Sequence, residues 1–303
     1  MIPEVVIASG KGGTGKTSLA AAFAALAGTN GVTVDADVDA ADLHLLLHPT
    51  FHEWNKFYGN QVAEIDAGRC VTCGACLEQC RFGAVRRVRQ SPPKCETGYA
   101  IMESRCEGCG LCAHVCPADA IRMKDHAAGE WMQSDTANGP FIHARLAPGA
   151  GSSGKLVATL KDHARRLAAA SGRKWILVDG PPGIGCPAIA ALSGASLLLA
   201  VTEPTPAGAE DLERLLELAA SFKLPAMVCV NRWDINPEKT REIEAMALRL
   251  GAPAAGRIRY DPGFVTAQRR GLTYTAFAAA GNPAAAWEDV KAVWDTVASR
   301  LSL

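Results

Sequence analysis

Eight cysteines, arranged in two runs of identical spacing, are the residues of this chain best suited to chemistry. Each run reads C-x2-C-x2-C-x3-C, and together they comprise Cys70, Cys73, Cys76 and Cys80, then Cys106, Cys109, Cys112 and Cys116. Iron corners need soft thiolate donors, and three of them two residues apart let one tight loop bind three corners of a cube. This spacing therefore predicts a pair of [4Fe–4S] clusters.

The fourth cysteine of each run is expected to cross to the other cluster, as in the bacterial two-cluster pattern. The first cluster would be bound by Cys70, Cys73, Cys76 and Cys116, and the second by Cys80, Cys106, Cys109 and Cys112. Structural zinc is the alternative, because paired C-x2-C units also bind Zn²⁺. Zinc needs neither the third cysteine nor the x3 step, and disulfides are disfavoured because nothing in the sequence indicates secretion.

A glycine-rich loop at residues 10–17 is the second segment that indicates chemistry. It reads G-K-G-G-T-G-K-T between a β-rich run and an alanine-rich run, which matches the phosphate-binding pattern G-x4-G-K-[ST]. In such a loop, backbone N–H groups and a helix N-terminus bind phosphate oxygens. We expect Lys16 to reach the β- and γ-phosphates of ATP and the Thr17 hydroxyl to bind Mg²⁺. The other nucleotide-binding candidates in the loop are Gly10, Lys11, Gly12, Gly13, Thr14 and Gly15.

A dinucleotide site is the competing interpretation of this loop. Gly10, Gly12 and Gly15 also satisfy G-x-G-x-x-G, and Asp35 could serve as the downstream acidic residue. The Lys16-Thr17 pair argues against that interpretation, because a dinucleotide fingerprint requires neither residue.

The surrounding sequence alternates short apolar runs with helical segments, which predicts an α/β fold with a parallel sheet buried on both faces. We predict a nucleotide-binding domain in two parts, residues 1–61 and 126–303, with a cysteine-rich module inserted at 62–125. Residues 126–152 are expected to be a returning connection around one strand, 141–146. The other expected elements are strands at 2–8, 32–35, 175–179, 197–202 and 226–231, and helices at 16–27, 154–171, 207–222, 237–250 and 284–301.

Composition excludes several classes of protein. Lys+Arg and Asp+Glu both number 31 among 303 residues, so no net charge favours nucleic acid or an anionic membrane. We see no signal peptide and no apolar run long enough to span a bilayer, so stable membrane insertion is not expected. Eleven cysteines in such a chain suit a reducing compartment, and the cytoplasm is the expected location.

Lys11, a second lysine just after the first glycine, gives the loop a resemblance to the deviant Walker A motif of the MinD/ParA/Mrp and nitrogenase iron-protein group. The resemblance implies a homodimer, or a heterodimer with a related ATPase, with ATP at the interface. It also implies that Lys11 reaches the partner's nucleotide, much as an arginine finger acts in trans. A simpler alternative is that Lys11 only raises the local positive potential.

Three more segments fit the same group. Residues 35–39 (D-A-D-V-D) resemble switch I, in which Asp37 would position the attacking water and lie near Mg²⁺. Residues 179–185 (D-G-P-P-G-I-G) resemble switch II, in which Asp179 would hold Mg²⁺ through water and the Gly183 backbone would sense the γ-phosphate. Asn231, in the segment 231–234, is the candidate for hydrogen bonds to adenine. Lys11, Lys16 and Asp37 are thus the catalytic candidates, and Thr17, Asp37 and Asp179 those for magnesium.

The whole chain resembles a MinD-like ATPase with a two-cluster ferredoxin module inserted after switch I. It lacks the C-terminal C-x-x-C of the Mrp-type carriers and a basic membrane helix. Cys186 stands where the nitrogenase iron protein has an intersubunit cluster ligand, and Cys95 is a spare thiol. The simpler interpretation of Cys186 is a small residue at a helix start.

These features favour an ATP-gated electron-transfer protein whose dimer packing controls two clusters and their access to a redox partner protein. A redox-sensing regulatory or positioning ATPase is the second hypothesis. An assembly or carrier factor for metal centres is the third, and complete four-thiolate ligation argues against it. Hydrolysis is expected to be slow and stimulated by dimerisation or a partner.

Overall fold

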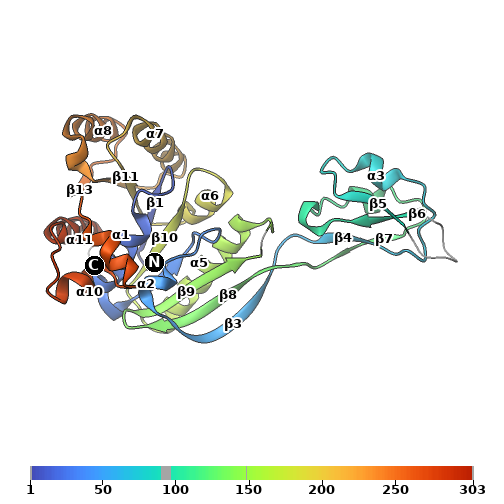
Figure 1. Cartoon of the computed structure of the whole chain (residues 1–303), viewed down its shortest axis with the longest axis horizontal. Helices are drawn as coiled ribbons and strands as arrows, with labels where there is room; N and C mark the ends of the chain where they lie inside the picture. Colours follow the sequence, from blue (N-terminus) through green and yellow to red (C-terminus); the bar gives the residue numbers. More distant parts are fainter. Residues whose placement is uncertain (1, 90–96, 148, 302–303) are drawn as a thin grey trace. The chain divides into compact units, whose positions relative to one another are not determined.

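The computed structural model describes residues 2–89, 97–147 and 149–301, which divide into two compact units (Figure 1). The larger unit comprises Met1–Asn55, Trp131–Arg145 and Ser153–Leu303, and the smaller comprises Lys56–Glu130 and Leu146–Ser152. The smaller unit therefore contains all described residues of the segment 62–125 and extends beyond it at both ends.

A nine-stranded sheet forms the centre of the larger unit. Its first seven strands pair in parallel, which confirms the predicted α/β fold with a mostly parallel sheet. The strand order is β13 (Ala254–Ile258), β12 (Ala226–Asn231), β11 (Leu197–Thr202), β1 (Glu4–Ser9), β10 (Trp175–Pro182), β2 (Gly31–Asp35), β9 (Gly139–Leu146), β8 (Ala127–Thr136) and β3 (Thr50–Tyr58).

The central strands are apolar at successive positions because helices cover both faces. Every residue of β1 is buried, and Val6 lies in register between Val178 of β10 and Leu198 of β11. Against one face pack α1 (Lys16–Ala27) and α11 (Trp287–Leu301), joined by α10 (Tyr274–Ala279). The remaining helices are α2 (His44–Leu47), α5 (Ser153–Ala170), α6 (Cys186–Leu192), α7 (Pro206–Ser221), α8 (Pro237–Arg249) and α9 (Gly263–Arg269).

The segment 126–152 was expected to hold one strand, and this expectation was wrong. It forms the hairpin β8–β9, and β3 adds a further edge strand next to β8. The sequence of β3 hides this role because an edge strand need not be apolar, and most of its side chains are exposed. No helix within the described ranges is long and apolar enough to cross a membrane.

The smaller unit consists of two antiparallel ribbons and two short helices. Each ribbon takes one strand from each half of the unit: β4 (Val62–Ile65) pairs with β7 (Ile121–Lys124), and β5 (Val85–Arg89) pairs with β6 (Thr97–Ile101). The short helices α3 (Ala75–Gln79) and α4 (Leu111–His114) each follow a glycine with positive φ. This exchange of strands gives the unit an internal repeat.

Candidate nucleotide site and paired cysteine sites

The glycine-rich loop connects β1 to α1 at the carboxyl edge of the sheet, where ligands bind in open α/β folds. A Cβ atom on Gly10 would lie 2.4 Å from the Cβ of Asp211, and one on Gly15 would lie 2.6 Å from Nδ2 of Asn231. The loop is therefore packed closely against α7 and the end of β12. Gly12 and Gly13 border open space.

Lys16 and Asp37 face one another in this loop region. The two side chains are largely buried, and Lys16 Nζ lies 3.7 Å from Asp37 Oδ2. Burial raises the pKa of Asp37, and the charge of Lys16 opposes that shift. The structure thus brings together two of the three predicted catalytic residues, and they balance one another's charge when no nucleotide is present.

Asp179 is a buried carboxylate at the end of β10. Neither of its oxygens has a hydrogen-bond partner of regular geometry among the described residues. Burial raises its pKa to about 6, against the opposing effects of Lys16 and the Thr17 hydroxyl. An unsatisfied buried carboxylate is costly unless a cation compensates it.

Asp35 lies beside Asp179 in the register of β2 and β10. It accepts hydrogen bonds from the backbone N–H groups of Asp37 and Leu43, both at 3.2 Å. Burial and the neighbouring charge of Asp179 raise the pKa of Asp35 well above its usual range. Asp35 therefore has a structural role, because it holds the backbone of the segment that follows β2.

Lys11 is bound within its own chain in this structure. Its Nζ lies 3.5 Å from Oε2 of Glu203, and the other carboxylate oxygen of Glu203 is bound by Arg232. Glu203 directly follows β11 and lies far from Lys11 in sequence, so no local pattern indicated this contact.

Gly183 and Asn231 also have protein partners. The N–H of Gly183 donates to the Ser9 carbonyl at 2.8 Å, so it is engaged by the loop itself. Asn231 donates through Nδ2 to the Thr14 carbonyl at 2.8 Å and accepts at Oδ1 from the Arg232 N–H at 3.0 Å. Recognition of adenine by Asn231 and of the γ-phosphate by Gly183 stay predictions.

The eight predicted cysteines gather into two sets, each around its own small and mainly apolar cavity in the smaller unit. One cavity is lined by Cys70, Cys73, Cys76 and Cys116. The other is lined by Cys80, Cys106, Cys109 and Cys112. The fourth cysteine of each run therefore lies with the other run, in the grouping that the spacing predicted.

Backbone N–H groups point at cysteine sulfurs in both sets. Ala84 and Ala120 donate to Cys80 and Cys116, each at 3.3 Å, and Ala63 donates to Cys106 at 3.5 Å. Burial raises the pKa of the Cys76 and Cys112 thiols. Within the described ranges, no three His, Cys, Asp or Glu side chains are placed to hold one metal ion. A cubane does not require that arrangement, since each of its thiolates binds a different iron atom.

Three cysteines do not belong to these runs, and one of them, Cys229, is buried in β12. Cys186 is exposed at the first residue of α6, and Cys95 lies outside the described residues. Nothing in the described part of the chain brings a second cysteine to Cys186, so an intersubunit metal site there stays an untested hypothesis.

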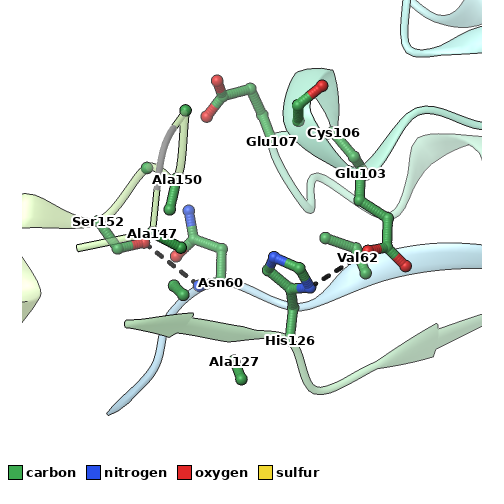
Figure 2. A pocket seen from close by; sticks show the side chains of 14 residues that line it. Asn60, Val62, Glu103, Cys106, Glu107, His126, Ala127, Ala147, Ala150 and Ser152 are labelled. Atoms are coloured by element: carbon green, nitrogen blue, oxygen red, sulfur yellow. Dashed lines mark hydrogen bonds and ion pairs between the residues drawn. The ribbon is translucent and has the colours of Figure 1, made fainter. Parts of the chain in front are cut away.

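A hollow of about 390 Å³ lies beside Cys106 within the smaller unit (Figure 2). Figure 2 shows His126 pointing toward Glu103, with Nδ1 and Oε2 3.5 Å apart, and Ser152 accepting from the N–H of Asn60. Its walls come from four separate segments, so no local pattern in the sequence could have indicated it.

Residues 5–274 match the family described as CbiA, the CobQ/CobB/MinD/ParA nucleotide-binding domain. The chain belongs to this family. Among curated proteins, it is 32% identical to the uncharacterized protein MJ0578 of Methanocaldococcus jannaschii over 78% of this chain and 80% of that protein. MJ0579 of the same organism is 26% identical over 78% of this chain and 82% of that protein.

Solved structures show the MinD/ParA fold alone, because their identities are low. MinD from Pyrococcus horikoshii, complexed with Mg-ADP, has a TM-score of 0.59 at 16% identity, covering 99% of this chain and 98% of that one. The Cyanothece McdA–ATP complex has a TM-score of 0.57 at 15% identity, covering 100% and 97%. In this MinD/ParA-family chain, the family match contains both the loop 10–17 and the cysteine-bearing unit.

Proposed function

We propose that this chain is a Mg-ATP-binding and ATP-hydrolysing switch that controls two [4Fe–4S] clusters, which exchange electrons with a partner protein. The observation that carries the proposal is the arrangement of the cysteines. In a chain of a nucleotide-binding family, each predicted set of four thiols surrounds its own cavity, including the cysteine that crosses from the other run.

The nucleotide site fits Mg²⁺ and a triphosphate. Asp179 has unsatisfied buried oxygens next to Thr17, which is the donor chemistry that a hard cation requires. When bound, Mg²⁺ would neutralise phosphate charge during transfer. Lys16 would exchange Asp37 for phosphate oxygens, which would leave the Asp37 carboxylate free to orient water. The P. horikoshii relative binds Mg-ADP, which supports the same class of ligand.

The cysteine sites fit iron–sulfur clusters by their donors. Each offers four thiols in a cavity with few other polar groups, and N–H donors that would stabilise bound sulfur are already aimed at Cys80, Cys106 and Cys116. Hydrogen bonds to cluster sulfurs and solvent exposure set the reduction potential. Bound clusters would serve as one-electron stores.

Two contacts would have to open when ATP binds and the dimer forms. Gly183 must release Ser9 before its N–H can bind a γ-phosphate, and Lys11 must leave Glu203 before it can reach a partner's nucleotide. When a bound nucleotide breaks such contacts, the nucleotide state changes how the two protomers pack. The active form is proposed to be a homodimer, or a heterodimer with a related ATPase.

The test is anaerobic reconstitution followed by redox titration with and without ATP. The holoprotein should contain about 8 Fe per chain, from two clusters of four irons. The reduction rate or potential of its clusters should respond to ATP. Lys16→Ala should weaken ATP binding at least tenfold and abolish the response with iron content unchanged. Lys174→Ala, an exposed lysine ahead of β10, is the matched control.

Cluster properties that are the same with ATP, without ATP and in Lys16→Ala would contradict the proposal. Zinc in place of iron after anaerobic purification would do so as well.

A redox-sensing regulatory ATPase is the second candidate. Cys73 and Cys109 are exposed, so oxidants could reach both clusters. That function predicts that brief exposure to oxygen changes the ATP hydrolysis rate, whereas an electron carrier would lose electron transfer and keep its hydrolysis rate. Transfer of iron and sulfide to an apo acceptor would instead support a carrier.

A further inference from the structure

The smaller unit contains its own internal comparison, because its two halves repeat at an offset of 36 residues. Cys70 corresponds to Cys106 and Cys80 to Cys116, and the ribbons and short helices repeat with them. Corresponding positions can therefore be compared to see how the charged and apolar side chains near the two cysteine sets differ.

Near the first cysteine set, arginines are paired with carboxylates. Arg69 Nη2 lies 3.3 Å from Asp119 Oδ2. Arg122 faces Glu64 across the β4–β7 ribbon, and its Nε donates to Oε2 at 2.7 Å. The cationic groups on this side already have anionic partners in the same chain.

Near the second set, the corresponding arginines remain and the carboxylates are replaced. Arg105 corresponds to Arg69, and Gly83 stands where Asp119 would be; Arg105 Nη1 is 3.9 Å from the position of a Cβ on Gly83. Arg86 corresponds to Arg122, and Ala100 faces it in place of Glu64. Within the described residues, neither arginine forms an ion pair.

At two positions the second cavity has larger apolar side chains than the first, and at a third Glu107 replaces Val71. Phe82 and Leu111 line its cavity, and both are exposed on their outer sides, at 40% and 38%. The corresponding residues at the first set are alanines, at positions 118 and 75. The guanidinium of Arg81 lies 5.8 Å from the centre of the Phe82 ring. The residue that corresponds to Arg81 in the other half is Pro117.

We propose that these residues form a docking face for an acidic protein electron carrier, placed over the second cluster. The arginine face consists of Arg81, Phe82, Arg86, Arg105 and Leu111. The proposal rests on the proposed function, since it requires a cluster in the cavity lined by Cys80, Cys106, Cys109 and Cys112. The first side, with its arginines paired, would not compete for the same partner.

Charge complementarity and the apolar centre favour a protein occupant. Arginine and aromatic side chains are enriched in protein interfaces, and opposite charge on a partner accelerates association. Phe82 and Leu111 would exclude water directly above the cluster cavity. A nucleic-acid duplex would engage the arginines through its phosphates and leave this apolar centre without a matching surface.

The electron step is simple. One electron leaves the reduced partner of the pair and enters the oxidised one, so one iron–sulfur centre is oxidised by one electron and the other is reduced by one. No bond forms or breaks, and no proton has to move. Docking at the second cluster only sets the distance and orientation of the two centres.

The internal repeat suggests the most specific variant for testing this proposal. Gly83→Asp with Ala100→Glu copies the carboxylates near the first cysteine set to the corresponding positions near the second. It should give Arg105 and Arg86 the partners that Arg69 and Arg122 have. Asp is tolerated at position 83, because its counterpart Asp119 has the same positive φ region (47° against 61°). Arg86→Gln is the second variant, and Arg122→Gln on the paired side is the control.

The probe is an acidic [2Fe–2S] ferredoxin mixed with anaerobic, reconstituted full-length holoprotein in a stopped-flow instrument. At low ionic strength, the double variant and Arg86→Gln should slow electron transfer by roughly tenfold or more and flatten its salt dependence. Arg122→Gln should change the rate by less than about twofold. An unchanged rate in both variants would overturn the docking proposal.

Further measurements separate this failure from failure of the proposed function. Iron content and the EPR spectra of both clusters are recorded for every variant, and absence of clusters in the wild type would sink both proposals. Normal clusters together with an unchanged electron-transfer rate in the variants would contradict the docking proposal alone. Tighter binding of a single-stranded oligonucleotide or anionic vesicles than of ferredoxin, with the same sensitivity to the variants, would assign the face to that ligand instead.

Discussion

The two units differ in what surrounds their functional side chains. In the larger unit, the nucleotide-site lysines are paired with Asp37 and Glu203, and the buried core runs through α1, α11 and the central strands. Among the described residues of the smaller unit, Ala63, Cys76, Val85 and Ile121 form a small buried cluster, and further cysteines pack directly against it. The larger unit can thus fold before a nucleotide binds. In the smaller unit, by contrast, the cysteine side chains proposed to bind the clusters are part of the core.

The largest expected effect follows from removal of iron. Without clusters, the smaller unit should lose amide-exchange protection in β4 and β7, because so small an apolar core cannot hold it together and metal binding supplies folding energy. Protection in β1 and β10 should change by less than about threefold. Hydrogen exchange read by mass spectrometry measures both units in one sample.

Cys186→Ser is the control for this experiment, since Cys186 belongs to neither set and the variant should keep about 8 Fe, the content of two clusters. Persistent protection of β4 and β7 in the iron-free protein would show that the smaller unit folds alone, and the comparison between the units would fail.

The sequence predicted the local patterns of both sites, but not the contacts between segments that are distant in the chain. The loop 10–17 and the cysteine runs are local patterns, and both the placement of Lys16 and Thr17 at the start of α1 and the crossing of Cys80 and Cys116 followed from spacing alone. Contacts between distant segments were not accessible. Glu203 beside Lys11 depends on the fold, and β3 and β8 lack the apolar alternation that identifies a strand.

A smaller effect is expected from Asp179, whose buried oxygens lack a hydrogen-bond partner of regular geometry among the described residues. Burial raises the pKa of Asp179 to about 6, so the folded apo protein holds a proton there that the unfolded chain releases near pH 4. Its contribution to stability is present at low pH and is lost as pH rises through about 6. Asp179→Asn should therefore stabilise the apo larger unit at pH 7 by on the order of 1–3 kcal/mol.

Urea unfolding followed by tryptophan fluorescence at pH 4 to 8 measures this difference, which should shrink toward pH 4. The same variant should bind Mg-ATP more weakly, because it loses the carboxylate that faces Thr17. Asp39→Asn, which changes an exposed aspartate in the segment 35–39, should alter neither quantity. A variant less stable than wild type at pH 7 would mean that the Asp179 carboxylate is compensated inside the protein, as Lys11 and Lys16 are.

The smallest effect concerns Lys11, whose internal partner competes with the proposed contact across a dimer. Glu203→Gln removes the partly exposed ion pair with Lys11, together with the pair that Glu203 forms with Arg232, and an exposed pair contributes at most about 1 kcal/mol. Release of Lys11 should therefore tighten the ATP-bound dimer about two- to fivefold. Sedimentation velocity with a non-hydrolysable ATP analogue measures the dissociation constant. Glu242→Gln, which removes the exposed pair with Lys239, is the matched control and should leave it unchanged. A dimer weakened by Glu203→Gln would show instead that Glu203 itself holds Lys11 in its productive position, and that the contact seen here persists in the assembled state.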